Sequence, residues 1–263
     1  MRIALCQVTS AGSPAENLDL ITEYTARAAE QGAELVVFPE AMMARFGVRL
    51  APIAEPLDGP WASTVAEVAA RHSVTIAAGM FTPAPDGRVF NTLLVTGGDR
   101  HLGYHKIHLF DAFGFAESDT VAPGDDTLVL DFGGVPVGFA LCYDVRFPEL
   151  FRKLADQGAT AIVLPASWGA GSGKQEQWEL LVRARALDCT SWLLACGQAD
   201  PAESGIETRG TAPTGIGHSL VADPYGRVHR QLGAGPDLLV VDIDPDRTRV
   251  ARTEIPVLAN RRL

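Results

Sequence analysis

Short apolar segments alternate with amphipathic segments from the start of the chain. Residues 3–8 and 35–38 are largely apolar, and between them apolar residues recur every three or four positions over residues 13–32. Helical spacing of this kind predicts a helix with one buried face, whereas short apolar runs are typical of buried strands. The first forty residues therefore predict a strand, a helix and a second strand. Ser13 and Glu16, with Pro14 after Ser13, fit a capping box that would mark the start of the helix.

The same alternation continues along the rest of the chain, where further helices are predicted at 60–72, 147–157 and 175–188. Further strands are predicted at 74–81, 91–95, 101–109, 128–132, 135–141, 161–164, 192–196, 217–222, 228–232 and 238–241, with turns at 86–87, 133–134 and 223–226. Residues 200–214 are predicted to form the one long loop. No repeat or linker divides the chain, so we expect one α/β domain over residues 1–263. Its strands are too many for one parallel sheet, which favours two stacked sheets.

Composition narrows the possible partners. A formal net charge of −10 and a pI near 5.0 argue against a nucleic-acid partner. The apolar runs fall far short of the roughly 20 residues that span a bilayer, and the N-terminus enters a predicted strand without a signal-peptide pattern, so no membrane association and a cytoplasmic location are expected. The four cysteines have no metal-ligand spacing, and we expect neither a metal nor another cofactor.

Reactive side chains follow four of the predicted strands. Glu40, Lys106, Cys142 and the pair Ser167 and Trp168 each come after an apolar run. Catalytic groups of α/β proteins collect outside the carboxyl ends of strands. If these strands share one sheet, the four ends should therefore share one rim.

Cys142 stands between a predicted strand and a predicted helix that begins near Phe147. Backbone N–H groups and a helix N-terminus at such a position can lower the pKa of a thiol, and the resulting thiolate is nucleophilic. The alternative is a cysteine packed in the core, since free cysteine is among the most buried residue types. The polar residues Tyr143, Asp144 and Arg146 that follow Cys142 favour a functional site.

Glu40 and Lys106 each allow a functional and a structural interpretation. Glu40 follows five apolar residues, and a poorly hydrated carboxylate can act as a base near neutral pH, but a solvated carboxylate at a strand end fits the same pattern. Lys106 could be a surface lysine at a strand edge. Only three of the 22 basic residues are lysines, however, which favours a specific role. A pair of Cys142 with His105 or His108 is a competing arrangement, although these histidines flank Lys106 on opposite strand faces.

Three blocks of this sequence resemble those of the nitrilase superfamily, whose members hydrolyse nitriles, amides and carbamoyl groups with a Glu-Lys-Cys triad. The blocks are residues 38–40 (FPE), 104–111 (YHKIHLFD) and 141–150 (LCYDVRFPEL). Residues 115–118, followed by Pro123 and Gly124, resemble the segment that carries a second glutamate of the family, here Glu117. Further matches lie at residues 166–168, 177–179, 183–186, 217–219 and 223–226, so the resemblance extends over the length of the chain.

The resemblance implies an α-β-β-α sandwich that pairs into an eight-layer dimer, so a homodimer or a larger homo-oligomer is expected. It implies Glu40, Lys106 and Cys142 as the catalytic triad, with Glu117 orienting Lys106 or the substrate amide. The backbone N–H of Tyr143 would join Lys106 in binding the oxyanion. The C-terminal tail, residues 245–263, is expected to pack on a partner subunit or on its own domain.

The sequence of the lysine block and the pair Glu117-Ser118 most resemble the omega-amidase and deaminated-glutathione-amidase branch. That branch releases ammonia from the side-chain amide of 2-oxo acids such as 2-oxoglutaramate. Cys142, Tyr143 and Asp144 stand where nitrilases usually carry Cys-Trp-Glu, which also favours an amide over a nitrile. The expected reaction is hydrolysis of a small carboxylate-bearing amide through a thioester. The alternatives are an N-carbamoyl hydrolase, an aliphatic amidase, a nitrilase, an acyl transferase and a non-catalytic binding protein.

Two further residues are candidates for substrate binding. A carboxylate-bearing substrate needs a cation, and the guanidinium of Arg146 is suited to bind a carboxylate with two hydrogen bonds. The alternative for Arg146 is a structural ion pair with Glu149 or Asp144. Trp168 is predicted to be either a wall of the pocket or a core residue.

Overall fold

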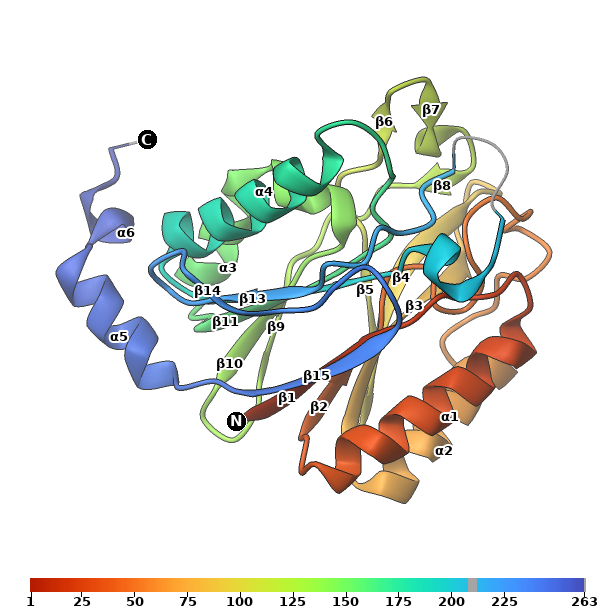
Figure 1. Ribbon diagram of the computed structural model, residues 1–263, viewed down its shortest axis with the longest axis horizontal. Coiled ribbons are helices and arrows are strands. Elements are labelled where there is room, and N and C mark those ends of the chain that lie inside the picture. The colour runs from red at the N-terminus through yellow and green to blue at the C-terminus, as the bar shows by residue number, and fades with distance from the viewer. Residues whose placement is uncertain (208–211, 263) are drawn as a thin grey trace.

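The computed structural model describes residues 1–207 and 212–262. Two β-sheets stack face to face, and helices cover the outer face of each sheet, so that one subunit has four layers in the order α-β-β-α (Figure 1). This architecture confirms the predicted fold class. Among the described residues, no helix is both long and apolar enough to traverse a bilayer.

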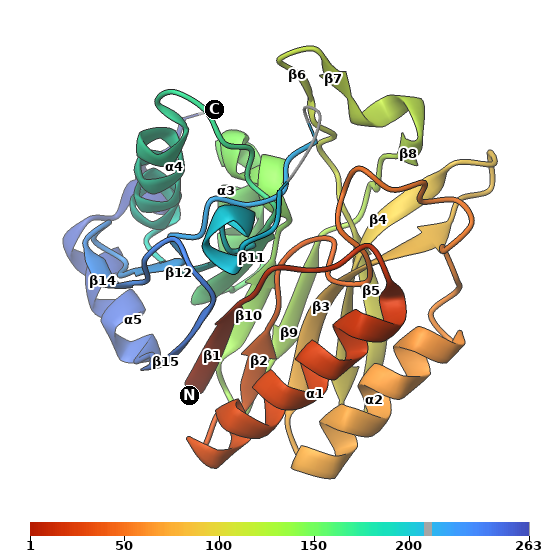
Figure 2. The ribbon, with the colours of Figure 1, turned by 45° about the vertical axis from the view of Figure 1, so that its right-hand side comes forward.

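The first sheet is built mostly from the N-terminal half of the chain. Its strand order is β15-β1-β2-β3-β4-β5, with β8 beside β4. The bounds are β1 Arg2–Gln7, β2 Leu35–Val37, β3 Thr75–Pro83, β4 Val89–Gly97, β5 Arg100–His105, β8 Val121–Ala122 and β15 Asp237–Asp242. Helices α1 (Pro14–Glu30) and α2 (Pro60–His72) lie side by side on its outer face (Figure 2). Strand β2 is parallel to β1 and β3.

The second sheet is built from the C-terminal half, in the order β14-β13-β12-β11-β10-β9. The bounds are β9 Leu128–Asp131, β10 Pro136–Phe139, β11 Ala161–Ala166, β12 Trp192–Gly197, β13 Leu220–Ala222 and β14 Val228–Gln231. Helices α3 (Pro148–Asp156) and α4 (Lys174–Cys189) cover its outer face. Strands β10, β11 and β12 run parallel to one another.

The inner faces of the two sheets pack against each other through apolar side chains. Leu5 and Val37 of the first sheet and Phe139 and Val163 of the second belong to one buried cluster. Successive side chains of a strand point to opposite faces, so the alternate residues contact the helices and form a separate cluster on each side. Full burial of such a side chain stabilises the folded state by roughly 1.5–3 kcal/mol. Many such side chains hold the two sheets together, so the stack supports the groups at the strand ends.

Several local expectations were wrong. Ser13 is the N-cap of α1, but its side chain makes no capping hydrogen bond, so the capping box does not form. The predicted strand 101–109 ends at His105, because the chain then turns and the Lys106 carbonyl accepts from Gly124 N. The short hairpin of β6 (Asp111–Ala112) and β7 (Phe115–Ala116) was not predicted, since two-residue strands carry no alternation. The predicted loop 200–214 contains a 3-10 turn, Pro201–Ser204, and residues 208–211 lie outside the described residues.

The C-terminal tail forms α5 (Pro245–Glu254) and α6 (Val257–Asn260) and contacts its own domain. Thr248 Oγ1 donates to the Thr160 carbonyl at 2.9 Å, and Arg252 donates to the Ala159 carbonyl at 2.7 Å. Arg261 pairs with Asp156 of α3 at 2.6 Å. Packing on a partner subunit stays a prediction.

Candidate active site

The four strand ends identified in the sequence meet, but they come from two sheets. Glu40 follows β2 and Lys106 follows β5 in the first sheet, whereas Cys142 follows β10 and Ser167 follows β11 in the second. The four ends therefore share one rim without sharing one sheet. The carboxyl ends of these four strands lie at the same side of the sandwich. All four residues line one cavity there.

Lys106 lies between two carboxylates inside the protein. Its Nζ donates to Glu40 Oε1 at 2.9 Å and to Glu117 Oε2 at 2.8 Å. The three side chains are 2%, 0% and 3% exposed, respectively, which excludes the surface-lysine and solvated-carboxylate interpretations. Burial alone lowers the pKa of Lys106, but the charges of Glu117 and Glu40 outweigh it and raise the pKa well above 10.5. The ammonium is therefore charged at any physiological pH.

Asn91 of β4 completes this charged cluster. The sequence pattern did not identify it as a site residue. Its Nδ2 donates to Glu40 Oε1 at 2.8 Å and to Glu117 Oε1 at 3.0 Å, so one amide bridges both carboxylates. Asn91 lay at the start of a predicted strand, and nothing in the local pattern indicated that it faces the carboxylates. The second oxygen of Glu40 accepts from Ser167 N at 2.8 Å, which links the two sheets through the site.

The backbone of Glu40 is held in place by a close approach of β3. A Cβ atom on Gly79 would lie 2.5 Å from the Ala41 nitrogen, a distance that only a glycine avoids. The Glu40 carbonyl also accepts from Gln198 Nε2 at 3.0 Å. The carboxylate is thus oriented by its backbone as well as by its own hydrogen bonds.

Cys142 stands on a sharp turn between β10 and a 3-10 helix, Cys142–Arg146. Its φ angle is +45°, a left-handed conformation that costs of order 1–3 kcal/mol for a residue other than glycine and is typical of functional sites. The residue is 7% exposed, and its Sγ lies 3.8 Å from the Ser167 carbonyl oxygen. Cys142 also lines the cavity, so the thiol contacts the cavity as well as the core.

The expected lowering of the Cys142 pKa was wrong. Burial raises the pKa of the thiol well above 9.0, and the negative charge of Glu40 raises it further, while Lys106 opposes them with a smaller effect. A short helix at the surface would have stabilised a thiolate, but here the low polarity of the interior favours the neutral thiol. A nucleophilic attack by Cys142 therefore requires that its proton be removed as the new bond forms.

Asp144 ties the cysteine turn to the lysine block. Its Oδ2 accepts from Leu141 N at 2.9 Å and from the Tyr104 hydroxyl at 2.6 Å, and its Oδ1 accepts from His108 N at 3.0 Å. His108 Nδ1 also lies 2.7 Å from Asp144 Oδ1, while His105 bonds Thr92. Neither histidine is among the described residues that line the cavity, which argues against a Cys–His pair.

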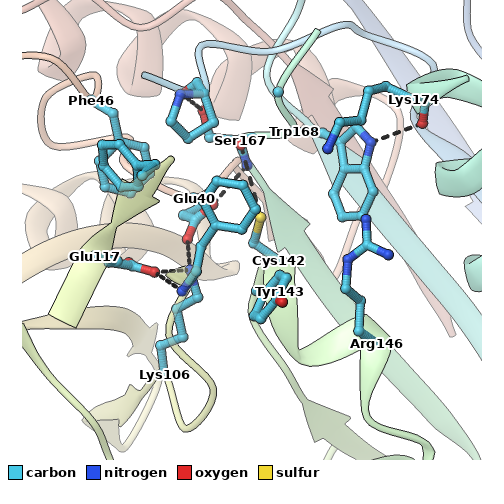
Figure 3. A pocket seen from close by; sticks show the side chains of 14 residues that line it. Glu40, Phe46, Lys106, Glu117, Cys142, Tyr143, Arg146, Ser167, Trp168 and Lys174 are labelled. Atoms are coloured by element: carbon cyan, nitrogen blue, oxygen red, sulfur yellow. Dashed lines mark hydrogen bonds and ion pairs between the residues drawn. The ribbon is translucent and has the colours of Figure 1, made fainter. Parts of the chain in front are cut away.

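The rest of the cavity wall is aromatic on several sides and carries two cations. The aromatic residues are Phe46, Phe110, Phe115, Tyr143 and Trp168, and the cations are Arg146 and Lys174. Figure 3 shows Arg146 and Lys174 on either side of Trp168, across Cys142 from the Lys106 cluster. Trp168 is 5% exposed and belongs both to the cavity and to a core cluster. Arg146 donates to Gln177 Oε1 at 2.9 Å and, within the described part of the chain, forms no ion pair with Glu149 or Asp144.

We expect the rate at which iodoacetamide alkylates Cys142 to rise continuously from about pH 7 to about pH 9, because only the thiolate reacts readily and the raised pKa keeps its fraction small throughout that range. The rate should be measured by mass spectrometry on the intact protein. Cys142→Ala is the control, since burial also raises the pKa of the thiols Cys6, Cys189 and Cys196. A plateau below about pH 8 would mean that a thiolate is already formed, contrary to this expectation.

Comparison with solved structures places this fold in a known class. Saccharomyces cerevisiae Nit3, a member of the nitrilase superfamily, aligns with a TM-score of 0.86 and 25% identity over 100% of this chain and 97% of that one. A variant of the amidase from Nesterenkonia sp. aligns with a TM-score of 0.81 and 27% identity over 100% and 94% of the two chains. That structure shows covalent addition of the acetamide moiety of fluoroacetamide at the active-site cysteine. The fold is thus that of the nitrilase superfamily.

Residues 2–253 match the carbon-nitrogen hydrolase family, and the chain belongs to that family. A Mycobacterium tuberculosis protein named as a hydrolase is 54% identical over 99% of this chain and 95% of its own length. The deaminated glutathione amidase of Escherichia coli O157:H7 is 34% identical over 94% and 92%. The omega-amidase of Mus musculus is 32% identical over 99% and 95%. The chain is therefore a hydrolase of carbon-nitrogen bonds from a family that includes amidases.

Proposed function

We propose that this enzyme is an amidase that hydrolyses a small carboxylate-bearing amide to the acid and ammonia through a cysteine thioester. The observation that carries the proposal is the juxtaposition of the buried Cys142 thiol with Glu40 and Lys106 in one cavity. The relatives named omega-amidase and deaminated glutathione amidase support an amide as the substrate. We infer 2-oxoglutaramate, which would release ammonia, and deaminated glutathione, which would release an amine in place of ammonia, as the first substrates to test.

In the first half of the reaction, the thiol sulfur of Cys142 attacks the amide carbon while its proton passes to Glu40. The amide C–N bond then breaks, Glu40 gives the proton to the leaving nitrogen, and ammonia departs. This leaves the acyl group on sulfur as a thioester. In the second half, Glu40 accepts a proton from water, whose oxygen attacks the thioester carbon, and the proton is returned to the Cys142 sulfur as the acid leaves.

The oxyanion formed in each attack needs donors that are already in place. An ammonium has three N–H donors, and Lys106 uses two of them on Glu40 and Glu117. The third has no partner among residues 1–207 and 212–262 and would donate to the oxyanion. The N–H of Tyr143 lies in the first turn of the 3-10 helix, where N–H groups have no partner within the helix. One such donor typically contributes about 3–4 kcal/mol to transition-state stabilisation. Glu117 orients Lys106 in this scheme.

A substrate panel tests the proposal. Turnover should be fastest with 2-oxoglutaramate, measured as ammonia, or with deaminated glutathione, measured as the released peptide amine. It should be slower with neutral aliphatic amides and slowest with nitriles. N-carbamoyl amino acids belong in the same panel, because carbon dioxide released together with ammonia would identify a carbamoyl hydrolase instead. Hydroxylamine added to the reaction would capture the acyl group as a hydroxamate if transfer to an amine competes with water. Absence of turnover with every amide would contradict the proposal and favour a binding protein.

We also propose a homodimer or larger homo-oligomer whose subunits meet at the outer helix layer of the second sheet. Leu180 and Leu187 lie seven residues apart on α4 and are 65% and 41% exposed, so they present an apolar stripe to solvent in the single subunit. Sedimentation velocity should give at least twice the subunit mass of 28.0 kDa, and Leu180→Lys should reduce it. A wild-type monomer would contradict this. A cytoplasmic location stays a prediction.

A further inference from the structure

The cavity has a second group of charged side chains, Arg146 and Lys174, which take no part in the proposed bond-breaking steps. We call this group the second charged pole of the cavity, the first being the Lys106 cluster. Lys174 is the first residue of α4 and lines the cavity on the side of Arg146, away from the Lys106 cluster (Figure 3). Its Nζ lies 3.4 Å from the centre of the Phe113 ring and 5.9 Å from that of Phe110. Among the described residues, no carboxylate pairs with Lys174. An aromatic face attracts the ammonium but accepts no full hydrogen bond from it, so its donors remain available.

Arg146 also keeps unused donors at this pole. One of its terminal nitrogens donates to Gln177, and the guanidinium lies 5.0 Å from the centre of the Trp168 ring. Its Nε is buried and has no hydrogen-bond partner among the described residues. A buried donor without a partner costs about 1–3 kcal/mol.

The first turn of α4 fixes both cations. Lys174 and Gln177 belong to that turn, Gln177 holds Arg146, and the Lys174 carbonyl accepts from Trp168 Nε1 at 2.9 Å. The positive end of the helix dipole lies at the same place. Burial lowers the pKa of Lys174 and the nearby positive charge of Arg146 lowers it further, as expected for two cations that share one space without a counterion. A bound anion would relieve that repulsion.

We propose that Lys174, together with Arg146, binds the carboxylate at the end of the substrate remote from the amide, and that Lys174 is a specificity-determining residue for half-amides of dicarboxylic acids. This inference rests on the proposed amidase function. The amide end lies at Cys142, between the two charged poles, and the aromatic walls contact the carbon chain that joins the ends. A neutral amide of equal length would leave both cations without a partner. The enzyme therefore selects its substrate by charge as well as by length.

The experiment compares glutaramate, the monoamide of glutaric acid, with pentanamide, a neutral amide of the same chain length. Lys174→Met should lower kcat/KM for glutaramate about tenfold or more, mostly through KM, and leave kcat/KM for pentanamide within about twofold. Lys174→Arg should restore most of the glutaramate activity. Lys153→Met is the matched control, because Lys153 is an exposed lysine of α3, and it should change neither substrate. An equal loss for both substrates, or for neither, would overturn the role of Lys174.

A second measurement does not depend on catalysis. Glutarate, which has no amide to hydrolyse, should protect Cys142 from iodoacetamide in the wild-type enzyme, and Lys174→Met should raise the glutarate concentration needed for half protection about tenfold or more. If glutarate protects but no amide of the panel is hydrolysed, the amidase proposal fails and the anion subsite stands. If glutaramate is hydrolysed and Lys174→Met leaves both KM and protection unchanged, the amidase proposal stands and the subsite fails.

Discussion

Glu40→Gln is expected to lower kcat for the amide substrate by about 1000-fold or more while the protein keeps its fold. A positioned general base contributes typically 10²–10⁴-fold, and in the proposed reaction Glu40 transfers protons in both halves. Glutamine has nearly the same shape, and the remaining pair of Lys106 and Glu117 keeps the buried ammonium neutralised. Ammonia release and the thermal unfolding midpoint should be measured on the same preparation. Glu67→Gln, an exposed site on α2, is the matched control and should have no effect on either.

In the same variant, iodoacetamide should alkylate Cys142 at least as fast as in wild type. The charge of Glu40 raises the pKa of the Cys142 thiol, and Lys106 lowers it. Removing the Glu40 charge therefore shifts the pKa of Cys142 downward, so that more thiolate is present at a given pH below it. Iodoacetamide labelling at about pH 8 should be at least as fast as in wild type, even though turnover is nearly abolished. Loss of both labelling and turnover would indicate a damaged site, and retained turnover would remove Glu40 from the mechanism.

The sequence predicted the two-sheet architecture and the proximity of Glu40, Lys106 and Cys142 because both depend on patterns that are local in the chain. Each β-strand that ends near the site is a short apolar run, and Glu40, Lys106 and Cys142 stand immediately after such runs. Strands β2 and β5 both run toward the site, as do β10 and β11, so a residue just beyond their ends lies at the same side of the sandwich.

Other features depend on contacts between distant segments, which no local pattern contains. Asn91 enters the site through the register of β4 against β5, in which Lys106 N donates to the Asn91 carbonyl at 2.9 Å. Lys174 enters it because Trp168 holds the start of α4 against the cavity. The pKa of Cys142 was misjudged for the same reason, since burial by both sheets outweighs the short helix beside it. A helix terminus is visible in a sequence, but the depth of a side chain in the folded protein is not.

Lys106→Met is expected to abolish turnover and also to lower stability, unlike the variants at Glu40. Lys106 is the ammonium that neutralises two carboxylates, and all three groups are almost completely buried. Removing one partner of a buried ion pair typically costs about 3–5 kcal/mol, because a charge is left without compensation in a medium of low polarity. For a chain of this length that cost lowers the unfolding midpoint by roughly 10 °C. Lys153→Met, on the exposed face of α3, should leave the midpoint unchanged.

A double-mutant cycle separates the charge effect from the loss of packing around the lysine stem. In a Glu117→Gln background only Glu40 remains charged beside position 106, so Lys106→Met should cost less stability there than in wild type. The difference should be of order 1–3 kcal/mol by denaturant titration, and turnover should stay abolished because the oxyanion still lacks its ammonium. If Lys106→Met costs the same in both backgrounds, packing and not charge holds Lys106 in place. The ammonium would then contribute to catalysis alone, and the buried cluster would not be the reason that the site keeps its geometry.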